Sequence, residues 1–170
     1  KVDVQELNID FLAGSGHKLC GPTGIGFLWS REKILNEIPP FLGGGEMIED
    51  VFEEKSTWAE LPHKFEAGTP AIAEAIGLAE ALKYIKKIGL NNINNYEKKI
   101  TQYLFNHLSN IENLHIIGPS PTNDQNRASL AAFYVDNIHS NDIAEILDSK
   151  GVCIRSGHHC CQPLHRHLGI

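Results

Sequence analysis

Short apolar runs and glycine-rich turns dominate the first third of the chain. The apolar runs at residues 9–13 and 24–29 each predict a short buried strand, and the residues between them form a glycine-rich turn. Residues 31–40 favour a short helix that a Pro-Pro pair ends. A long irregular loop, often functional in compact domains, is predicted for residues 43–58, whose sequence is GGGEMIEDVFEEKSTW.

An amphipathic helix is the clearest element that the pattern predicts. Its sequence is GTPAIAEAIGLAEALKYIKKIG, in which Thr69 can cap the helix, Pro70 suits the first turn and Gly89 ends it. Apolar residues recur at helical spacing and predict one buried face, formed by Ile72, Ile76, Ala79, Leu82 and Ile85. A second amphipathic helix is predicted for residues 92–108.

The pattern changes after the second helix. Strands are predicted at residues 114–117, 129–135 and 152–155, and a polar loop is predicted between the first two at residues 118–127. A helix is predicted after the second strand, over residues 141–150, with Ser140 as its cap. This order indicates a small α+β unit that begins somewhere near residue 90 to 112.

Composition and charge restrict the function classes. The chain has 170 residues, 42% of them hydrophobic, which suits one medium globular domain or two small ones. A net charge of −6 and an isoelectric point near 5.8 argue against a dominant surface for nucleic acid or anionic membranes, because either needs clustered Lys and Arg. No window approaches the roughly 18 consecutive apolar residues of a membrane span, so we expect a soluble chain. The four cysteines are too unevenly spaced for a disulfide framework, and we expect reduced thiols.

The turn between the first two predicted strands carries a single lysine. The stretch AGSGHKLCGPTGIGFLW places Lys18 among glycines, where a lysine held at a fixed point and partly desolvated can act as a nucleophile. The glycines would leave room for a flat cofactor, and Ser15 and His17 could donate hydrogen bonds to a phosphate. The pattern alone also fits a surface lysine in a hairpin turn, which is the commoner case.

Spacing excludes two other phosphate-binding motifs. GPTGIG leads into a predicted strand rather than a helix, so it is not a dinucleotide fingerprint, and the P-loop pattern GxxxxGK[ST] does not occur. Thr69 offers a different anion site, because a hydroxyl and free backbone N–H groups at a helix N-terminus suit a phosphate. An ordinary cap without a ligand is the local alternative for Thr69.

A second group of reactive residues lies near the end of the sequence, in CIRSGHHCCQPLHRH. Cys160 has two histidines beside it and Arg155 upstream, which could lower the pKa of its thiol and favour the nucleophilic thiolate. A structural zinc site is less well supported, because adjacent His-His and Cys-Cys pairs lack the usual gaps between zinc ligands. Buried packing is the remaining alternative, and it suits Cys153 better than Cys160.

Four motifs together resemble one family. SGHKLCGPTGIGFLW, GGGEMI, FEAGTP and RSGHHCCQPLH occur in the order and style of SufS-type, group II cysteine desulfurases, which are pyridoxal-phosphate (PLP) enzymes of the class V aminotransferase superfamily. The resemblance covers essentially the whole chain, and GHHC favours group II over group I. It implies an α/β fold: residues 1–90 would be the C-terminal part of the PLP-binding large domain of fold type I transferases, and residues 91–170 most of the small C-terminal α+β domain.

The resemblance also implies roles for single residues. Lys18 would form a Schiff base with pyridoxal 5'-phosphate, and Cys160 would capture sulfur from L-cysteine as a persulfide while L-alanine leaves. Ser15 and His17 would contact the phosphate of the cofactor in the same subunit. Thr69 would reach the phosphate in the partner subunit, which implies a homodimer with shared sites.

Further implications concern the substrate, the partners and the ends of the chain. Arg155 would lie near the substrate and help to orient it, and a SufE- or SufU-like protein would accept the sulfur for iron–sulfur cluster assembly. The compartment would be the cytoplasm, or the plastid in a photosynthetic eukaryote, with no nucleic acid, membrane or metal involved. Further catalytic residues of the family are expected outside this sequence. We therefore expect a C-terminal fragment that lacks both ends and is inactive by itself.

Two other classes of function stay open. One is a different PLP enzyme of the same superfamily, such as a selenocysteine lyase or a kynureninase-like hydrolase; the hydrolase would have no use for Cys160. The other is a scaffold or sulfur-relay protein that has lost the cofactor. Cys161 adds a second thiol beside the expected nucleophile, and this thiol could accept or divert the persulfide.

Overall fold

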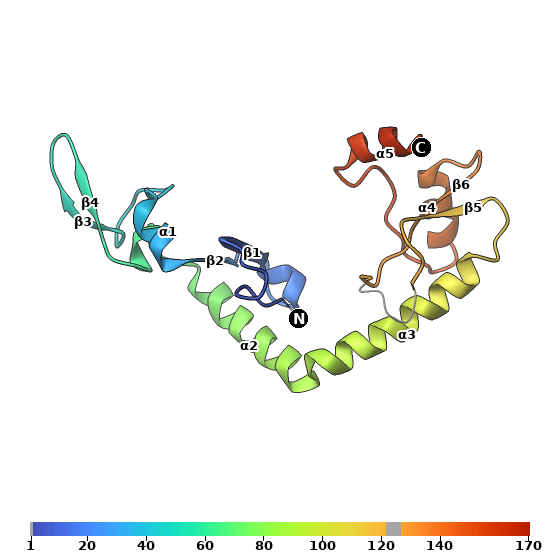
Figure 1. The fold of residues 1–170 in the computed structure, drawn as a ribbon, viewed down its shortest axis with the longest axis horizontal. Coiled ribbons are helices and arrows are strands. Elements are labelled where there is room, and N and C mark those ends of the chain that lie inside the picture. The colour runs from blue at the N-terminus through green and yellow to red at the C-terminus, as the bar shows by residue number, and fades with distance from the viewer. Residues whose placement is uncertain (1, 122–126) are drawn as a thin grey trace. The chain divides into compact units, whose positions relative to one another are not determined.

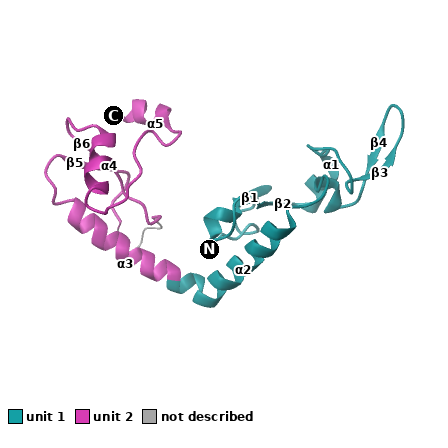
Figure 2. Ribbon diagram, turned by 180° about the vertical axis from the view of Figure 1, so that it is seen from behind, with its two compact units in different colours: residues 1–92 teal, residues 93–170 magenta. Residues whose placement is uncertain are grey.

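The structure is a computed structural model that describes residues 2–121 and 127–170 (Figure 1). Within those residues the chain forms five α-helices, two 3-10 helices and three separate two-stranded antiparallel sheets. The chain divides into two compact units, Lys1–Asn92 and Ile93–Ile170 (Figure 2). No helix among the described residues is both long enough and apolar enough to cross a membrane.

The first unit opens with a hairpin that carries the lysine turn. β1 (Phe11–Ser15) pairs antiparallel with β2 (Gly26–Ser30), and every residue of β1 lies opposite one of β2. The 3-10 helix η1 (Gly16–Leu19) follows β1 directly. Both predicted strands are therefore present, and each starts two residues later than the apolar pattern indicates. The prediction that they are buried is wrong, because Ser30 is the only buried residue of β1 and β2 in this two-stranded sheet.

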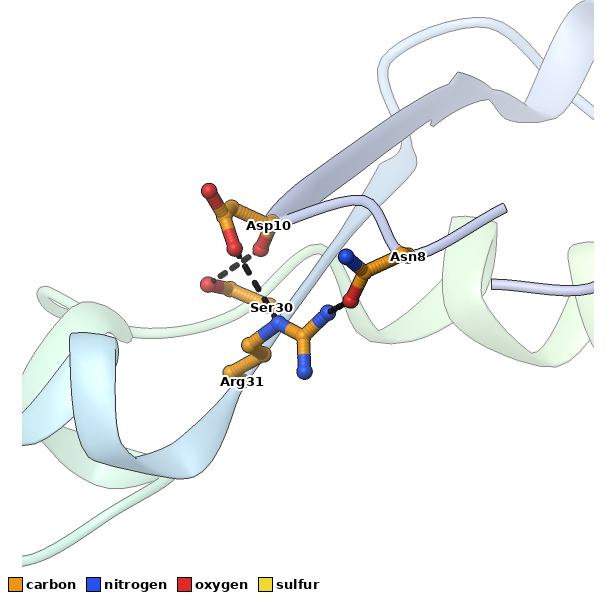
Figure 3. A network of polar contacts seen from close by, with 4 residues as sticks. All are labelled: Asn8, Asp10, Ser30 and Arg31. Carbon is orange, nitrogen blue, oxygen red and sulfur yellow. Dashed lines mark hydrogen bonds and ion pairs between the residues drawn. The ribbon is translucent and has the colours of Figure 1, made fainter. Parts of the chain in front are cut away.

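A polar network fixes the end of this hairpin that lies opposite η1 (Figure 3). Ser30 Oγ donates to the main-chain carbonyl of Asp10 at 2.8 Å, and Arg31 Nε donates to Asp10 Oδ1 at 3.0 Å. Another guanidinium nitrogen of Arg31 donates to Asn8 Oδ1 at 2.6 Å. These bonds join the segment before β1 to the end of β2, so the strands cannot separate without breaking them.

The loop predicted at residues 43–58 is partly a second hairpin. α1 (Glu32–Glu37) forms where a short helix is predicted, and β3 (Ile48–Val51) then pairs with β4 (Ser56–Trp58). A main-chain hydrogen bond of 2.8 Å closes the turn at residues 52–55. The prediction of a wholly irregular loop is wrong because this turn, Phe-Glu-Glu-Lys, has none of the Gly or Asn residues that mark a hairpin in a sequence.

The long predicted helix is present as α2 (Ile72–Ile88), but it starts later than predicted. Its N-cap is Ala71, which makes no side-chain capping bond, and Gly89 is its C-cap. Thr69 and Pro70 therefore both precede the helix. The prediction that Thr69 caps α2 and that Pro70 lies in its first turn is wrong, because the ψ angle of 76° at Ala71 lies outside the helical region.

The side of α2 that packs in this chain is not the predicted apolar face. A Cβ on Gly77 would lie 3.2 Å from Pro22, and a Cβ on Gly21 would lie 3.0 Å from Leu78, so the turn after η1 approaches the helix closely. Ala81, one turn further along, is buried. Four of the five members of the predicted face are exposed: Ile72, Ile76, Ala79 and Leu82. The prediction fails because the period of apolar residues does not show which side of α2 the lysine turn contacts.

The second unit is organised around α3 (Leu90–Leu108), a helix close to the predicted one. Phe105 is only 3% exposed, and the guanidinium carbon of Arg127 lies 4.5 Å from the centre of its ring. Arg127 also donates to the main-chain carbonyls of Ile117 and Leu130, at 3.3 and 3.2 Å. One arginine thereby joins the helix to both sides of the connection between the strands of this unit.

Two strands and two short helices complete the second unit. β5 (Leu114–Ile117) and β6 (Ala132–Val135) form an antiparallel pair; β5 has the predicted bounds, and β6 starts three residues later than predicted. Residues 122–126 of the predicted polar loop lie outside the described residues. α4 (Ser140–Asp148) and α5 (Gln162–Leu168) follow.

The start of α4 and the segment after it differ from the predictions. The N-cap of α4 is His139, whose side chain accepts from Asn141 N at 3.2 Å, so the prediction of Ser140 as cap is wrong by one residue. The predicted strand at residues 152–155 is also wrong. Val152 N instead donates to the carbonyl of Leu147 at 3.0 Å and closes the end of α4. The residues that follow have no pairing strand among the described residues.

Candidate active site

Lys18 lies in η1, at the end of the β1–β2 hairpin, and its side chain is exposed. Gly16 N donates to Ile25 O at 2.9 Å and Gly21 N donates to Gly16 O at 3.0 Å, so main-chain bonds close the turn on both sides of the lysine. Cys20 ends η1 in the left-handed region, with φ of 59°. The backbone therefore holds Lys18 in a defined place while its amine stays accessible.

The packing of the turn limits what can replace its glycines, most strictly at Gly16. A Cβ on Gly14 would lie 2.4 Å from the ring of Phe27, and a Cβ on Gly16 would lie 2.8 Å from the side chain of Ile25 and 2.9 Å from its carbonyl. The contact at Gly16 involves a backbone carbonyl and is not tolerated, whereas the contact at Gly14 is with the outer edge of the exposed Phe27 ring, which can turn aside. The packing of the turn therefore accounts for Gly16 by itself, and the expectation that the glycines leave room for a flat cofactor stays a prediction.

Three polar side chains of the turn are available to a ligand. Ser15, His17 and Lys18 follow one another closely along the end of β1 and η1, and within residues 2–121 and 127–170 their side chains make no hydrogen bond or ion pair. An amine can bond to an aldehyde, while a hydroxyl and an imidazole can donate to a phosphate. This donor set fits pyridoxal phosphate, which carries both an aldehyde and a phosphate.

Thr69 is exposed, and its hydroxyl makes no hydrogen bond to the described part of the chain. Because Ala71 rather than Thr69 is the N-cap of α2, the Thr69 hydroxyl does not satisfy a backbone N–H of the helix. Thr69 follows Gly68, whose N–H donates to Gly45 O at 2.9 Å. The GGGEMI and FEAGTP motifs are thus in direct contact, and Thr69 lies at the end of the paired segment.

Lys64, just before this segment, is a buried lysine that the sequence pattern does not single out. It is 8% exposed, and its Nζ donates to the carbonyls of Leu35 and Asn36 at 3.0 and 3.1 Å. Only its position one residue before FEAGTP could have marked it in the sequence. The loop between β4 and α2 therefore contains a buried ammonium group that is hydrogen-bonded to α1, besides the predicted Thr69.

Cys160 lies in a tight turn between α4 and α5, and its side chain is exposed. Cys161 N donates to His158 O at 2.9 Å, which closes a four-residue turn. The two central residues, His159 and Cys160, have φ angles of 50° and 62°. Positive φ at both central positions is the mark of a type I′ turn, which usually takes Gly or Asn, so a residue with a side chain is held here against its backbone preference.

The neighbours of Cys160 hold the turn in place. The thiol of Cys161 donates to the carbonyl of His158 at 2.9 Å, and the rings of His158 and His165 meet edge to face with centres 5.2 Å apart. Ser156 Oγ donates to Asn141 Oδ1 at 2.9 Å, which ties the segment before the turn to α4. The two adjacent cysteines therefore differ, because Cys161 is half-buried and hydrogen-bonded while Cys160 is exposed.

The remaining predicted residues of the second unit are exposed. The Arg155 side chain is accessible and makes no hydrogen bond or ion pair within the described part of the chain. All four cysteines are free thiols, and Cys153 and Cys160 are both exposed, so the alternative of buried packing fits neither of them. Among the described residues, no group of three or more His, Cys, Asp or Glu side chains is placed to hold a metal ion.

The family of the chain follows from sequence comparison. The family model for aminotransferase class-V matches residues 1–170, the full length of the sequence. The chain belongs to the class-V aminotransferase family. Among curated class-V relatives, a probable cysteine desulfurase of Synechocystis is 54% identical over 97% of the chain, and a cysteine desulfurase of Haloferax volcanii is 47% identical over 99%. The chain spans 39% of the length of each of these proteins.

Solved structures give the same assignment. The class-V chain matches the cysteine desulfurase CsdA from Escherichia coli with a TM-score of 0.90 and 36% identity, over 99% of the chain and 41% of CsdA. It matches the apo cysteine desulfurase of Thermococcus onnurineus with a TM-score of 0.84 and 41% identity, over 98% of the chain and 41% of that protein. A structure of C-DES with glycine covalently linked to its PLP cofactor matches with a TM-score of 0.75 and 26% identity, over 91% of the chain and 40% of C-DES. The predicted α/β fold, part of a PLP-dependent transferase, is confirmed.

Proposed function

We propose that the protein containing this chain is a PLP-dependent cysteine desulfurase of the SufS-type, group II class, converting L-cysteine to L-alanine. One observation carries the proposal: a class-V aminotransferase chain presents an accessible lysine, Lys18, and an accessible cysteine, Cys160, each in a turn closed by main-chain hydrogen bonds. Among the described residues the Lys18 amine has no partner. The names of the curated relatives support the reaction, and the GHHC sequence before Cys161 supports the group.

The residues of the first unit would hold the cofactor. The Lys18 amine would bond to the aldehyde of pyridoxal phosphate, and Ser15 and His17 would donate to its phosphate. Thr69 would donate to the phosphate bound by a partner subunit, which requires a homodimer. Pyridoxal phosphate, when bound, supplies an electron sink that makes the α-proton of an amino acid removable.

The reaction then needs one proton transfer and one nucleophile from this chain. The free amine of Lys18 would remove the proton from Cα of L-cysteine, and Arg155 would help to orient the substrate. The thiolate of Cys160 would attack the substrate sulfur, so that the S–Cβ bond breaks and the sulfur stays on Cys160 as a persulfide. Protonation of the remaining carbon skeleton gives L-alanine.

We also propose the domain assignment and the onward path of the sulfur. Residues 1–90 would belong to the PLP-binding large domain and residues 91–170 to the small C-terminal domain; the division of the chain into compact units ending and starting at Asn92 and Ile93 supports this. Cys160 would then come from the small domain to a cofactor held by the large one. A SufE- or SufU-like protein would accept the sulfur and supply iron–sulfur cluster assembly in the cytoplasm.

Replacing the proposed nucleophile tests the function. In the full-length protein loaded with PLP, Cys160→Ser should lower alanine formation in the presence of a sulfur acceptor by roughly 100-fold or more, because the nucleophile is lost. The visible absorbance of the lysine-bound cofactor should stay unchanged. Cys161→Ser is the matched control and should keep most of the activity. Full activity of Cys160→Ser, or sulfur mapped by mass spectrometry to Cys161 alone, would contradict the assignment of Cys160.

A second candidate is a lyase that releases its sulfur product free. It is favoured by the match to C-DES, a cystine C-S lyase whose structure holds its reaction product cysteine persulfide, with a TM-score of 0.74 and 27% identity. Such an enzyme would convert cystine with Cys160→Ser as fast as the wild type does. Persulfide found only in solution after reaction with either substrate would favour this lyase.

A further inference from the structure

Lys64 is a buried cation with an unusual set of partners. It lies in the 3-10 helix η2 (His63–Phe65), between β4 and α2. Its ammonium donates to the carbonyls of Leu35 and Asn36, at 3.0 and 3.1 Å, and these carbonyls belong to the last turn of α1. The carbonyl end of a helix carries partial negative charge and lacks intrahelical donors, so a cation is a suitable cap for it.

Packing alone does not account for a lysine at this position. Among the described residues no carboxylate pairs with Lys64, and its nearest aromatic contact is the ring of Phe65, 5.4 Å from Nζ. Burying an ammonium group costs free energy that only its partners offset, whereas an apolar side chain of similar length would fill the same space without that cost. The gain from Lys64 must therefore be the specific link between η2 and the end of α1.

The link fixes one end of the segment that leads to Thr69. Glu66 N donates to His63 O at 2.9 Å, and Gly68 N donates to Gly45 O at 2.9 Å. Met47, in the facing loop, is fully buried, and its carbonyl accepts from Ala59 N at 2.9 Å. Residues 64–68 are thus held at their start by Lys64 and at their end by the GGGEMI motif, and Thr69 is the next residue.

We propose that Lys64 is a positioning residue for Thr69, and through Thr69 for the phosphate of bound pyridoxal phosphate. This inference rests on the proposed function, in which Thr69 donates to that phosphate. Without the Lys64 ammonium, residues 64–68 lose their attachment to α1, and the Thr69 hydroxyl is no longer held where a phosphate can reach it.

Titration of the apoprotein with pyridoxal phosphate tests the proposal. In the full-length protein, Lys64→Met should raise the dissociation constant for pyridoxal phosphate by roughly tenfold, the scale of one lost charge-assisted hydrogen bond. Lys64→Arg, which keeps charge and donors, should stay within roughly threefold of the wild type. Lys55→Met is the matched control, because the Lys55 ammonium also lies beside a neighbouring ring, that of Phe52 at 5.5 Å, but is exposed. It should leave the dissociation constant unchanged.

A double-mutant cycle distinguishes positioning from a general loss of stability. If Lys64 acts through Thr69, Lys64→Met should have little further effect in a Thr69→Val background, because the same bond is already lost. A full tenfold effect in that background, or an unchanged dissociation constant for Lys64→Met alone, overturns the proposal. Lys64→Gln, which keeps one amide donor, replaces Lys64→Met if the latter does not fold.

Hydrogen exchange separates failure of this inference from failure of the proposed function. In the apoprotein, Lys64→Met should speed the exchange of the Glu66 and Gly68 amides, while Lys64→Arg and Lys55→Met should not. Unchanged exchange overturns the anchoring role whether or not pyridoxal phosphate binds. A wild-type protein that binds no pyridoxal phosphate refutes the proposed function and the phosphate-positioning role together, while faster exchange would still show the anchor itself.

Discussion

At the scale of single residues, the two adjacent cysteines are the sharpest contrast in the chain. The Cys161 thiol donates a hydrogen bond to the carbonyl of His158 and is half-buried, whereas Cys160 is exposed at the tip of its turn. A hydrogen-bonded, partly covered thiol is a poorer nucleophile than a free one. This difference supports the proposal that Cys160 is the reactive thiol, although the sequence shows only two neighbouring thiols.

This contrast predicts the order of alkylation. With limiting iodoacetamide, Cys160 of the full-length protein should be modified several times faster than Cys161, because the Cys161 thiol is occupied by its hydrogen bond. Peptide mass spectrometry at short reaction times measures both rates in one sample. Equal rates, or faster modification of Cys161, would show that the bond to His158 does not protect it.

The sequence singles out candidate reactive residues more readily than it singles out polar residues that are buried. Lys18 and Cys160 are recognisable because a nucleophile needs particular neighbours, and the structure places both in rigid, accessible turns. Lys64 is missed because no local pattern shows that a lysine is buried against a helix end 28 residues earlier. Thr69 is predicted as a phosphate contact from its place at a helix cap, and the structure puts Ala71 at that cap instead.

At the scale of elements, the β1–η1–β2 hairpin depends on close contacts between backbone atoms. A Cβ at position 16 would meet the Ile25 carbonyl at 2.9 Å and the Pro22 carbonyl at 3.2 Å. Backbone atoms on both sides cannot move aside as a flexible side chain can. The turn that holds Lys18 therefore requires glycine at position 16 for steric reasons.

Gly16→Ala should accordingly destabilise the protein by about 1–3 kcal/mol, the usual cost of overpacking. Gly43→Ala is the control, because a Cβ there meets nothing within 4 Å, and it should be neutral or stabilise the protein by up to about 1 kcal/mol. Urea denaturation of the full-length apoprotein measures both changes. A Gly16→Ala variant as stable as the control would mean that the hairpin can widen.

Helices in which apolar residues repeat with a clear period are predicted well. Strands are predicted less well, because a strand also needs a partner strand that the local sequence does not show. The two long helices are found because many apolar residues repeat at helical spacing over 17 and 19 residues. The β3–β4 hairpin is missed because its turn has no glycine or asparagine, and a strand is wrongly predicted at residues 152–155 because an apolar run does not guarantee a partner. Which face of α2 is covered depends on contacts far apart in the sequence.

At the scale of the whole molecule, the chain covers little of its apolar surface. Only three hydrophobic residues of the described chain are buried, Met47, Ala81 and Phe105, whereas Phe41 is 95% exposed and many other large apolar side chains are accessible. Each of the three sheets has two strands, which is too few for independent stability. Since the chain spans about 40% of its curated relatives, the rest of the protein is expected to cover these surfaces.

Expressed as these 170 residues alone, the chain should therefore associate with itself. It should bind the dye ANS strongly and elute from gel filtration above the monomer volume, because exposed apolar patches of this extent drive association. The full-length protein is the control and should bind little dye. A 170-residue chain that elutes as a monomer and does not increase the fluorescence of ANS would contradict the expectation.

The turn around Cys160 also has a stereochemical consequence. A φ near +60° is strained for an L-residue but is the natural region of its mirror image, so a D-amino acid would occupy this backbone without steric cost. A cysteine at the start of a synthetic peptide is also the residue at which two peptide segments can be joined chemically. A semisynthetic chain with D-cysteine at position 160 would keep the backbone of the turn but point the thiol in another direction. Comparing it with the natural chain would show whether the function of the loop depends on its backbone shape or on the direction of its thiol.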